Sequence, residues 1–213
     1  MNNLKYGILG GTFNPIHNAH LFSAELVREE CSLDKVIFLP TGNPPHKKMD
    51  SIGNEHRLAM VKMAIEGNEH FQVSEIEVFS KEVNYTINTM RKLKTENINI
   101  DYYFIIGADE AMILDRWKDV GELLKLCSFI VVNRPGFSDE SVKNKINEIT
   151  SRYGGNIAIV SGPRLDISST EIRKRAENGK TIRYLVPDKV EEYIAKEHLY
   201  RWWQWITMKW LSF

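Results

Sequence analysis

Short apolar runs alternate with longer segments of helical period along this chain. Several of the runs are apolar throughout, which is typical of strands that are covered on both faces of a parallel sheet. We therefore expect strands at about residues 6–9, 35–39, 71–73, 102–106, 129–132 and 157–160.

The segments between these strands carry apolar residues at helical spacing. The clearest follows Asn84 and includes Ile87, Met90 and Leu93. Another begins after Asn18, which we expect to be its N-cap because asparagine favours that position. In all, we expect helices after Asn84, from after Asn18 to about residue 30, and at about residues 55–66, 119–126 and 138–152.

Strand and helix alternate repeatedly, which predicts an α/β fold: a Rossmann-like, doubly wound parallel sheet with right-handed crossovers. Such sheets bind ligands beyond the carboxyl ends of their strands, where the strand order reverses. The sequence has no internal repeat. We expect residues 1–200 to form one domain, with a small C-terminal helical part at about 168–200.

The composition narrows the choice of partner. The chain is 43% hydrophobic and 26% charged, as in packed globular proteins. Its 28 Lys and Arg residues balance 28 Asp and Glu residues, so the formal net charge is zero. Nucleic-acid binders usually have a basic excess, so we expect no nucleic-acid partner. A bound anion must then be held by a local site.

The cysteines and the N-terminus favour a cytoplasmic protein. Cys31 and Cys127 are isolated and lack zinc-type spacing, as expected of free thiols in a reducing compartment. The first residues do not read as a secretory signal. No run of about 18 apolar residues is present, so we expect no membrane span.

The most informative segment is Leu-Gly-Gly-Thr-Phe-Asn-Pro-Ile-His-Asn-Ala-His at residues 9–20. An apolar strand runs into Gly10 and Gly11, where missing side chains let a ligand approach the backbone. A turn and a helix follow. His17 and His20 therefore lie at a helix N-terminus, whose N–H groups and dipole attract anions. Both imidazoles can donate hydrogen bonds to phosphate oxygens.

Other interpretations of this segment stay open from the residues alone. Gly10 and Gly11 could form a plain tight turn, and His20 could be a partly buried structural side chain. The spacing matches neither a Walker loop nor the dinucleotide fingerprint. His-x-x-His supplies only two zinc ligands, and no nearby Cys or Asp completes a set, so we expect no protein-bound metal.

A second anion-binding element is expected in Ile-Ser-Ser-Thr-Glu-Ile-Arg at residues 167–173. Ser168 and Glu171 have the spacing of a capping box, which predicts a short helix at about 169–177. Arg173 would lie in an early turn, where a cation is disfavoured by roughly 0.3–1 kcal/mol. A bound polyphosphate would explain that placement.

Together, these segments resemble the signature motifs of the nucleotidyltransferase superfamily with the His-x-x-His motif, and in particular of bacterial nicotinate-mononucleotide adenylyltransferases. The resemblance runs from about residue 5 to Tyr200. Asn14 stands where that family usually has Asp, and Ala19 where it has Gly; neither change removes a phosphate ligand. The resemblance assigns catalytic roles to His17 and His20, and ATP contacts to Gly10, Gly11, Thr12 and Phe13.

The resemblance extends to further ATP contacts. It implies that Arg173 grips the β and γ phosphates and that Ser168 and Ser169 add donors. Gly-Asn-Pro-Pro-His-Lys at residues 42–47 resembles the family's Pro-Pro-His-Lys loop, in which two prolines would hold Lys47 at a fixed reach on the phosphates. Arg134 matches a loop near the adenine.

The residues that contact ribose and acceptor are expected in the middle of the chain. Asp109 ends a segment that resembles the family's Ile-Gly-x-Asp motif, whose Asp contacts the adenosine ribose; it could also be the N-cap of a helix at 110–114. Tyr85, Thr86 and Trp117 resemble the elements around the nicotinate ring. Trp117 offers a stacking face, worth about 1 kcal/mol beyond area burial, or is a core aromatic.

Two differences bear on the choice of acceptor. Asn84 stands where Ser is common in the family, and residues 77–83 lack an arginine that the resemblance leads us to expect. Selectivity for acid over amide therefore stays open. Arg57 matches a family arginine to which the resemblance assigns no definite role.

The resemblance implies transfer of the adenylyl group of ATP to nicotinate mononucleotide, giving nicotinate adenine dinucleotide and pyrophosphate in NAD biosynthesis. The attacking phosphate is already an anion, so catalysis would come from positioning and charge neutralisation. Without an acidic cluster, Mg²⁺ is expected to arrive on ATP. The alternatives are another acceptor (nicotinamide mononucleotide, phosphopantetheine or FMN) and, in a different class, a non-catalytic nucleotide sensor.

Residues 201–213 hold four of the five tryptophans and lie beyond the resemblance. The segment is too short to span a bilayer. Three interpretations stay open: a contact in a homo-oligomer, an interfacial membrane helix, and an artificial or frame-shifted end.

Overall fold

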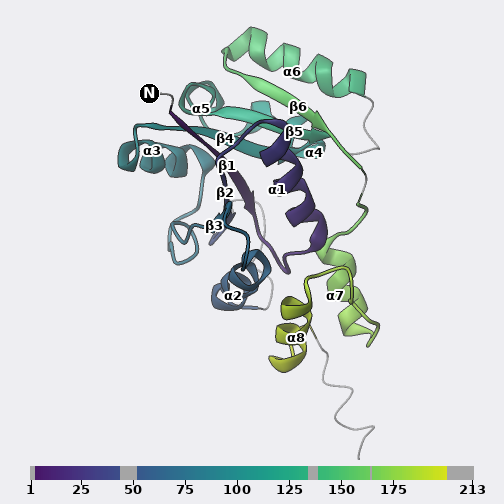
Figure 1. The fold of residues 1–213 in the computed structure, drawn as a ribbon. Coiled ribbons are helices and arrows are strands. Elements are labelled where there is room, and N and C mark those ends of the chain that lie inside the picture. The colour runs from purple at the N-terminus through teal and green to yellow at the C-terminus, as the bar shows by residue number, and fades with distance from the viewer. Residues whose placement is uncertain (1–2, 44–51, 134–138, 164, 201–213) are drawn as a thin grey trace, which may run out of the picture.

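The computed structural model describes residues 3–43, 52–133, 139–163 and 165–200. Within them, six strands form one parallel sheet in the order β3-β2-β1-β4-β5-β6 (Figure 1). All six predicted strands are confirmed, as is the α/β class. The strands are β1 (Leu4–Gly11), β2 (Lys35–Pro40), β3 (Phe71–Val73), β4 (Ile100–Gly107), β5 (Ser128–Asn133) and β6 (Ile157–Ser161).

The helices between the strands lie close to their predicted positions. The helices predicted to end at about residues 30, 66, 126, 152 and 177 begin and end within one residue of the expected bounds, whereas the helix expected at 110–114 lies earlier, at Ala108–Ala111. The helical segments are α1 (Asn18–Glu30), α2 (Asn54–Ile65), α3 (Thr86–Glu96), α4 (Ala108–Ala111), the 3₁₀ turn η1 (Leu114–Arg116), α5 (Val120–Leu126), α6 (Asp139–Tyr153), α7 (Ser169–Glu177) and α8 (Asp188–Lys196).

The strand order reverses beside β1, as in doubly wound sheets. β1 pairs in parallel with β2 on one side and with β4 on the other. The chain adds β2 and β3 on the first side and β4, β5 and β6 on the second. The ligand-binding crevice of such a sheet lies beyond the carboxyl ends of β1 and β4, which end at Gly11 and Gly107.

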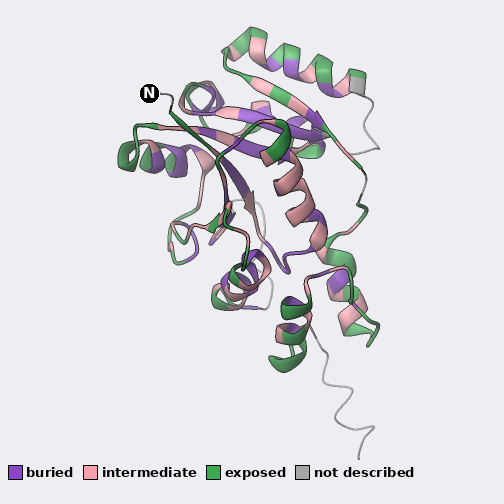
Figure 2. Ribbon diagram, in the orientation of Figure 1, coloured by how far each residue is buried: buried purple, intermediate pink, exposed green. Residues whose placement is uncertain are grey.

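Hydrophobic side chains fill both faces of the sheet. Successive residues of a strand point to opposite faces, and Ile8 and Leu9 of β1 accordingly belong to different core clusters. Helices α1, α2, α7 and α8 contribute to the Leu9 cluster, and α3, α4, α5 and α6 to the Ile8 cluster. Figure 2 shows buried residues along the central strands and exposed residues on α3 and α6.

The two C-terminal helices pack against the body of the fold. Val190 and Ile194 of α8 are buried in the same cluster as residues of α2. His56 Nδ1 on α2 and the Tyr193 hydroxyl on α8 lie 2.9 Å apart in a hydrogen bond. This packing fixes the segment from α7 to Tyr200 next to the start of α1 (Figure 1).

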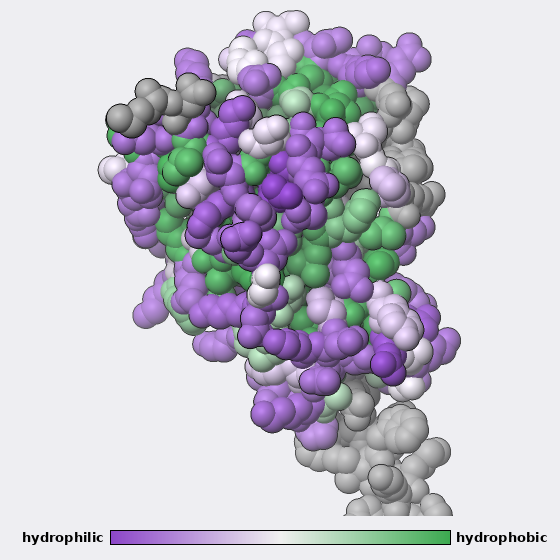
Figure 3. Space-filling view, viewed as in Figure 1, coloured by the Kyte–Doolittle hydropathy of each residue, from purple (hydrophilic) through white to green (hydrophobic). Residues whose placement is uncertain are grey.

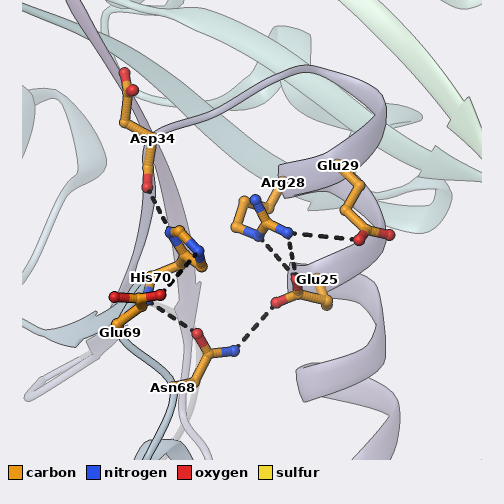
Figure 4. Close-up of polar contacts among 7 residues, drawn as sticks. All are labelled: Glu25, Arg28, Glu29, Asp34, Asn68, Glu69 and His70. Atoms are coloured by element: carbon orange, nitrogen blue, oxygen red, sulfur yellow. Dashed lines mark hydrogen bonds and ion pairs between the residues drawn. The ribbon is translucent and has the colours of Figure 1, made fainter.

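A polar cluster lies at the other end of α1 (Figure 4). Glu25 accepts hydrogen bonds from Arg28 Nε at 2.8 Å and from Asn68 Nδ2 at 3.2 Å. Burial opposes ionisation of Glu25, but these hydrogen bonds and the Arg28 charge outweigh it and lower the pKa of this carboxyl. The His70 ring contacts the Asp34 carbonyl at 3.3 Å. The cluster therefore ties α1 to the loop that precedes β3.

The cysteines and the helices agree with the expectations from the sequence. Cys31 and Cys127 are free, as predicted. Burial raises the pKa of the Cys127 thiol to about 12, so this side chain behaves as a small core residue. Among the described residues, no helix has the length and apolarity needed to cross a membrane.

Candidate active site

The strand that leads into the site continues through both of its glycines. β1 ends at Gly11, in register with Pro40, so the tight-turn interpretation of the glycine pair is wrong. A Cβ on Gly10 would lie 3.1 Å from the Phe104 ring, and one on Gly11 would lie 3.2 Å from the Phe13 ring. The glycines therefore make room for aromatic rings that support the turn.

The two histidines form a stacked pair at the start of α1. Their ring centroids are 3.6 Å apart with an interplanar angle of 22°. His17 is buried and His20 is half-buried. The His17 backbone N–H donates to His20 Nδ1 at 3.2 Å. Because a backbone N–H only donates, Nδ1 is the unprotonated nitrogen, and neutral His20 carries its proton on Nε2.

The N-terminus of α1 differs from the prediction in one respect. His17 is the N-cap, and Asn18 is the first helical residue. The Asn18 N–H donates to the Leu185 carbonyl at 2.9 Å, and its side chain donates to the Tyr184 carbonyl at 2.7 Å. The hydrogen-bond donors of Asn18, which was expected to be the N-cap, are thus paired with carbonyls that are distant in the sequence. An anion here must rely on the imidazoles and the helix dipole more than on this N–H.

The second anion element docks on the first. Ser168 caps α7 by accepting a hydrogen bond from the Glu171 N–H at 3.2 Å, as predicted. The Ser169 hydroxyl donates to the Pro15 carbonyl at 2.9 Å, and Arg173 donates to the Asn14 carbonyl at 2.7 Å. Two motifs more than 150 residues apart are therefore held side by side.

Asn14 lies buried between these motifs. Asn14 is only 3% exposed. Its Oδ1 accepts a hydrogen bond from the Tyr200 hydroxyl at 2.6 Å. Its carbonyl accepts from Arg173. The amide that replaces the usual family carboxylate therefore links the turn after β1 to the C-terminal helices.

Arg57 lies behind the turn and is 1% exposed. Its guanidinium donates to the Thr12 carbonyl at 2.5 Å, to the Thr41 carbonyl at 2.6 Å and to Asn54 Oδ1 at 2.7 Å. Burial lowers the pKa of Arg57, and the nearby Tyr200 hydroxyl opposes this. The sequence signal for its burial is its place on the same helix face as buried Met60 and Val61, three and four residues later.

Asp109 lies beyond the carboxyl end of β4. It is exposed within the first turn of α4, whose N-cap is Gly107, so the N-cap interpretation of Asp109 is wrong. Its Oδ1 would be 2.6 Å from a Cβ at Gly107. The carboxylate thus folds back over Gly107 at the carboxyl end of β4, the strand next to β1. There it can accept hydrogen bonds from a ligand.

The predicted acceptor residues lie together on one core cluster. Tyr85 is the N-cap of α3, and Thr86 is its first residue. Tyr85 and Trp117 are both half-buried and pack against the Ile8 cluster. Trp117 meets Phe104 edge-on at 5.9 Å, so it is a core contact that still exposes part of its ring. Lys118 Nζ lies 4.4 Å from the Tyr85 ring centroid, a cation to which the sequence assigned no role.

Asn84 anchors the loop that follows β2. Its Oδ1 accepts a hydrogen bond from the Asn43 N–H at 2.6 Å, and its own N–H donates to the Asn43 carbonyl at 2.9 Å. A Cβ on Gly42 would lie 1.9 Å from the Glu77 carbonyl oxygen, so only glycine fits there. The residue that stands where the family commonly has Ser therefore has a structural task.

Lys47 and Arg134, two of the predicted ATP contacts, lie outside the described residues. In the part of the chain that the structure describes, no group of three or more His, Cys, Asp or Glu side chains could hold a metal ion. The described residues bring together Gly10, Gly11, Thr12, Phe13, His17, His20, Ser169 and Arg173 around the turn after β1.

Comparisons with known proteins agree on one family. The family model described as cytidylyltransferase-like matches residues 8–175. A probable nicotinate-nucleotide adenylyltransferase of Thermoanaerobacter sp. (strain X514) is 45% identical over 93% of this chain and 95% of its own. One from Clostridium botulinum (strain Kyoto / Type A2) is 41% identical over 93% of this chain and 100% of its own. The chain belongs to the nicotinate-nucleotide adenylyltransferase family.

Solved structures show the same nucleotidyltransferase fold. A nicotinic acid mononucleotide adenylyltransferase of Plasmodium falciparum, complexed with NaAD, matches 92% of this chain and 97% of its own with a TM-score of 0.75. The two are 22% identical, so this match concerns the fold. The family resemblance in the sequence and the fold that it implied are thus confirmed.

Proposed function

We propose that this member of the family transfers the adenylyl group of ATP to nicotinate mononucleotide, producing nicotinate adenine dinucleotide and pyrophosphate. The observation that carries this is the docking of α7 on the turn after β1, which joins the stacked histidines to Arg173 at the strand-order reversal. Each of these groups suits a polyphosphate. Family membership supports the reaction class.

The chemistry requires positioned cations and donors. The 5′-phosphate of the acceptor attacks the α-phosphorus of ATP in line, and the bond to pyrophosphate breaks. His20 Nε2–H and the His17 ring would stabilise charge on the transferring phosphate, while Arg173 would bind the leaving phosphates. Thr12 and Phe13 would offer backbone contacts, and Lys47 would add a cation. No general base is needed, because the attacking phosphate is already ionised.

The rest of ATP would lie beyond β4 and β5. Asp109 would accept hydrogen bonds from the adenosine ribose, and Arg134 would lie near the adenine. Ser168 and Ser169 would lie beside the triphosphate. Mg²⁺ would arrive with ATP, because oxygen-rich phosphates supply the ligands it prefers. We further infer that the enzyme works in the cytoplasm and binds no nucleic acid, in keeping with its free cysteines and zero net charge.

The acceptor site favours an acid over an amide. Thr86 is at the N-terminus of α3, where the helix dipole and unpaired N–H groups attract a carboxylate. Lys118, beside the Tyr85 ring, adds a positive charge. Trp117 would stack on the pyridine ring. These features support nicotinate mononucleotide over nicotinamide mononucleotide as the acceptor.

A paired-variant assay tests the proposal. His20→Asn keeps an acceptor close to the position of Nδ1 for the His17 N–H but removes Nε2–H. We expect a folded protein with kcat lower by about 10²–10³-fold, the usual loss for one donor to transition-state charge. Arg28→Met, at the far end of α1, is the control and should keep wild-type kcat. Dinucleotide formation that is equally fast in the wild type and His20→Asn would refute the assignment.

A further inference from the structure

A buried cation lies directly behind the phosphate-binding turn. Arg57 is 1% exposed, and its hydrogen-bond acceptors are three neutral oxygens, from Thr12, Thr41 and Asn54. Its Nε is buried and has no hydrogen-bond partner. No Asp or Glu within the described ranges forms an ion pair with it. Among the described residues, the hydrogen bonds of this guanidinium thus go to neutral oxygens, and no carboxylate balances its charge.

An unbalanced buried charge is costly to the fold. Burial disfavours an ion unless an opposite charge or a full set of hydrogen bonds compensates. A methionine or leucine would fill the same volume on this face of α2 without that cost, next to buried Met60 and Val61. The retention of a cation here is best explained by an anion that binds nearby.

The contacts of Arg57 also orient two peptide units of the site. It holds the Thr12 carbonyl, which follows β1, and the Thr41 carbonyl, which follows β2. Both peptides are trans, so the N–H groups of Phe13 and Gly42 point away from the guanidinium. Neither N–H makes a backbone hydrogen bond within the part of the chain that the structure describes. One side chain thus sets the spacing and the donor direction of two loops.

We propose that Arg57 is a positioning residue that also provides the standing positive charge of the polyphosphate site. It fixes the peptides at Thr12 and Thr41 and attracts the phosphate chain through the turn without touching it. The ligand class is a di- or triphosphate with its magnesium. The identification of that ligand as ATP rests on the proposed function, whereas the attraction of pyrophosphate does not.

Asn54 offers a test of the charge apart from the packing. Asn54→Asp keeps an oxygen acceptor for Arg57 and adds a negative charge, whereas Asn54→Ala removes the side chain and adds none. Both lose the hydrogen bond from Asn54 to the Val78 carbonyl. We expect Asn54→Asp to bind magnesium pyrophosphate about tenfold more weakly than Asn54→Ala, by calorimetry, since the new carboxylate cancels the Arg57 field. Its melting temperature should be equal or higher.

Equal pyrophosphate affinities of the two Asn54 variants would overturn the proposal, because the affinities should be equal if Arg57 has only a structural role. A second pair keeps the test valid should either variant not fold. Arg57→Lys should bind pyrophosphate about tenfold more tightly than Arg57→Met, while both lose about 100-fold in kcat because the turn is no longer held. Equal affinities in this pair would also overturn it.

Arg28 provides the control variant, and two outcomes with the wild-type chain separate this proposal from the proposed reaction. Arg28→Met removes a partly buried arginine roughly 16 Å farther along α1 than His17 and should leave pyrophosphate affinity unchanged. Absence of pyrophosphate binding by the wild-type chain would count against Arg57 as the site's charge. Absence of dinucleotide product, with the affinity differences intact, would instead refute only the proposed reaction.

Discussion

In the proposed site, single side chains would decide which ion each part attracts. Lys118 is the clearest case on the acceptor side, since its Nζ lies 4.4 Å from the Tyr85 ring centroid at the N-cap of α3. Lys118 thus supplies a positive charge on the acceptor side, although residues 77–83 contain no arginine. The expected family arginine therefore has a candidate replacement on another element.

We expect Lys118→Met to weaken selection of the acid. A carboxylate close to an ammonium gains energy that an amide does not, so kcat/KM for nicotinate mononucleotide should fall by about tenfold and that for nicotinamide mononucleotide by much less. Steady-state rates with both acceptors measure this. Lys143→Met, on α6, is the control. A proportional loss with both acceptors would mean that Lys118 only supports Tyr85.

Glu77 and Glu25 predict opposite pH dependences of stability. Burial raises the pKa of Glu77 above its ordinary value of 4.5, and the hydrogen bond from Thr89 only partly opposes it. Its stabilising contribution is therefore complete below about pH 4.5 and is lost as pH rises through the folded pKa. The pKa of Glu25 is lowered, so its contribution is present above about pH 4.5 and is lost as pH falls further.

Urea unfolding at about pH 4, 6 and 8 separates the two cases. Glu77→Gln should gain stability relative to the wild type as pH rises, since glutamine keeps the oxygen that Thr89 contacts. Glu25→Gln should be less stable than the wild type near neutrality and approach it in acid. A Glu77→Gln difference that does not change with pH would contradict the burial argument.

At the scale of elements, the strands and helices could be predicted because their signals are local. Apolar runs and helical periodicity placed them, and the Ser168–Glu171 spacing placed the cap of α7. The cap of α1 could not be placed, because Asn18 is bound by carbonyls of Tyr184 and Leu185, more than 160 residues away. The docking of α7 on the turn depends on the same kind of distant contact.

The docking of α7 makes a prediction about Ser169. Removing its hydroxyl from the Pro15 carbonyl should cost about 1 kcal/mol of stability, the usual value of such a hydrogen bond. Because Arg173 is carried by the same helix, kcat/KM should also fall by about tenfold as it shifts. Thr95→Ala removes an exposed hydroxyl bonded to Arg91 on α3 and should change neither. Ser169→Ala with wild-type kinetics would mean that the turn alone places Arg173.

At the scale of the whole molecule, the sheet order gathers these parts. The βαβ pattern predicted the doubly wound sheet, and hence a site where the strand order reverses; the structure places that reversal beside β1, between β2 and β4. It could not predict which face the C-terminal helices would cover, since that depends on packing such as the His56–Tyr193 contact. Figure 3 shows hydrophilic residues over much of the visible face, with hydrophobic residues between them.

The proposed function is defined by the acceptor that the enzyme uses. Purified protein is given ATP, Mg²⁺ and either nicotinate or nicotinamide mononucleotide, and both the dinucleotide and the pyrophosphate are quantified. We predict stoichiometric products, with kcat/KM at least about tenfold higher for nicotinate mononucleotide, because the start of α3 and Lys118 pair with its carboxylate. Equal rates with the two acceptors, or no dinucleotide from either, would contradict the account.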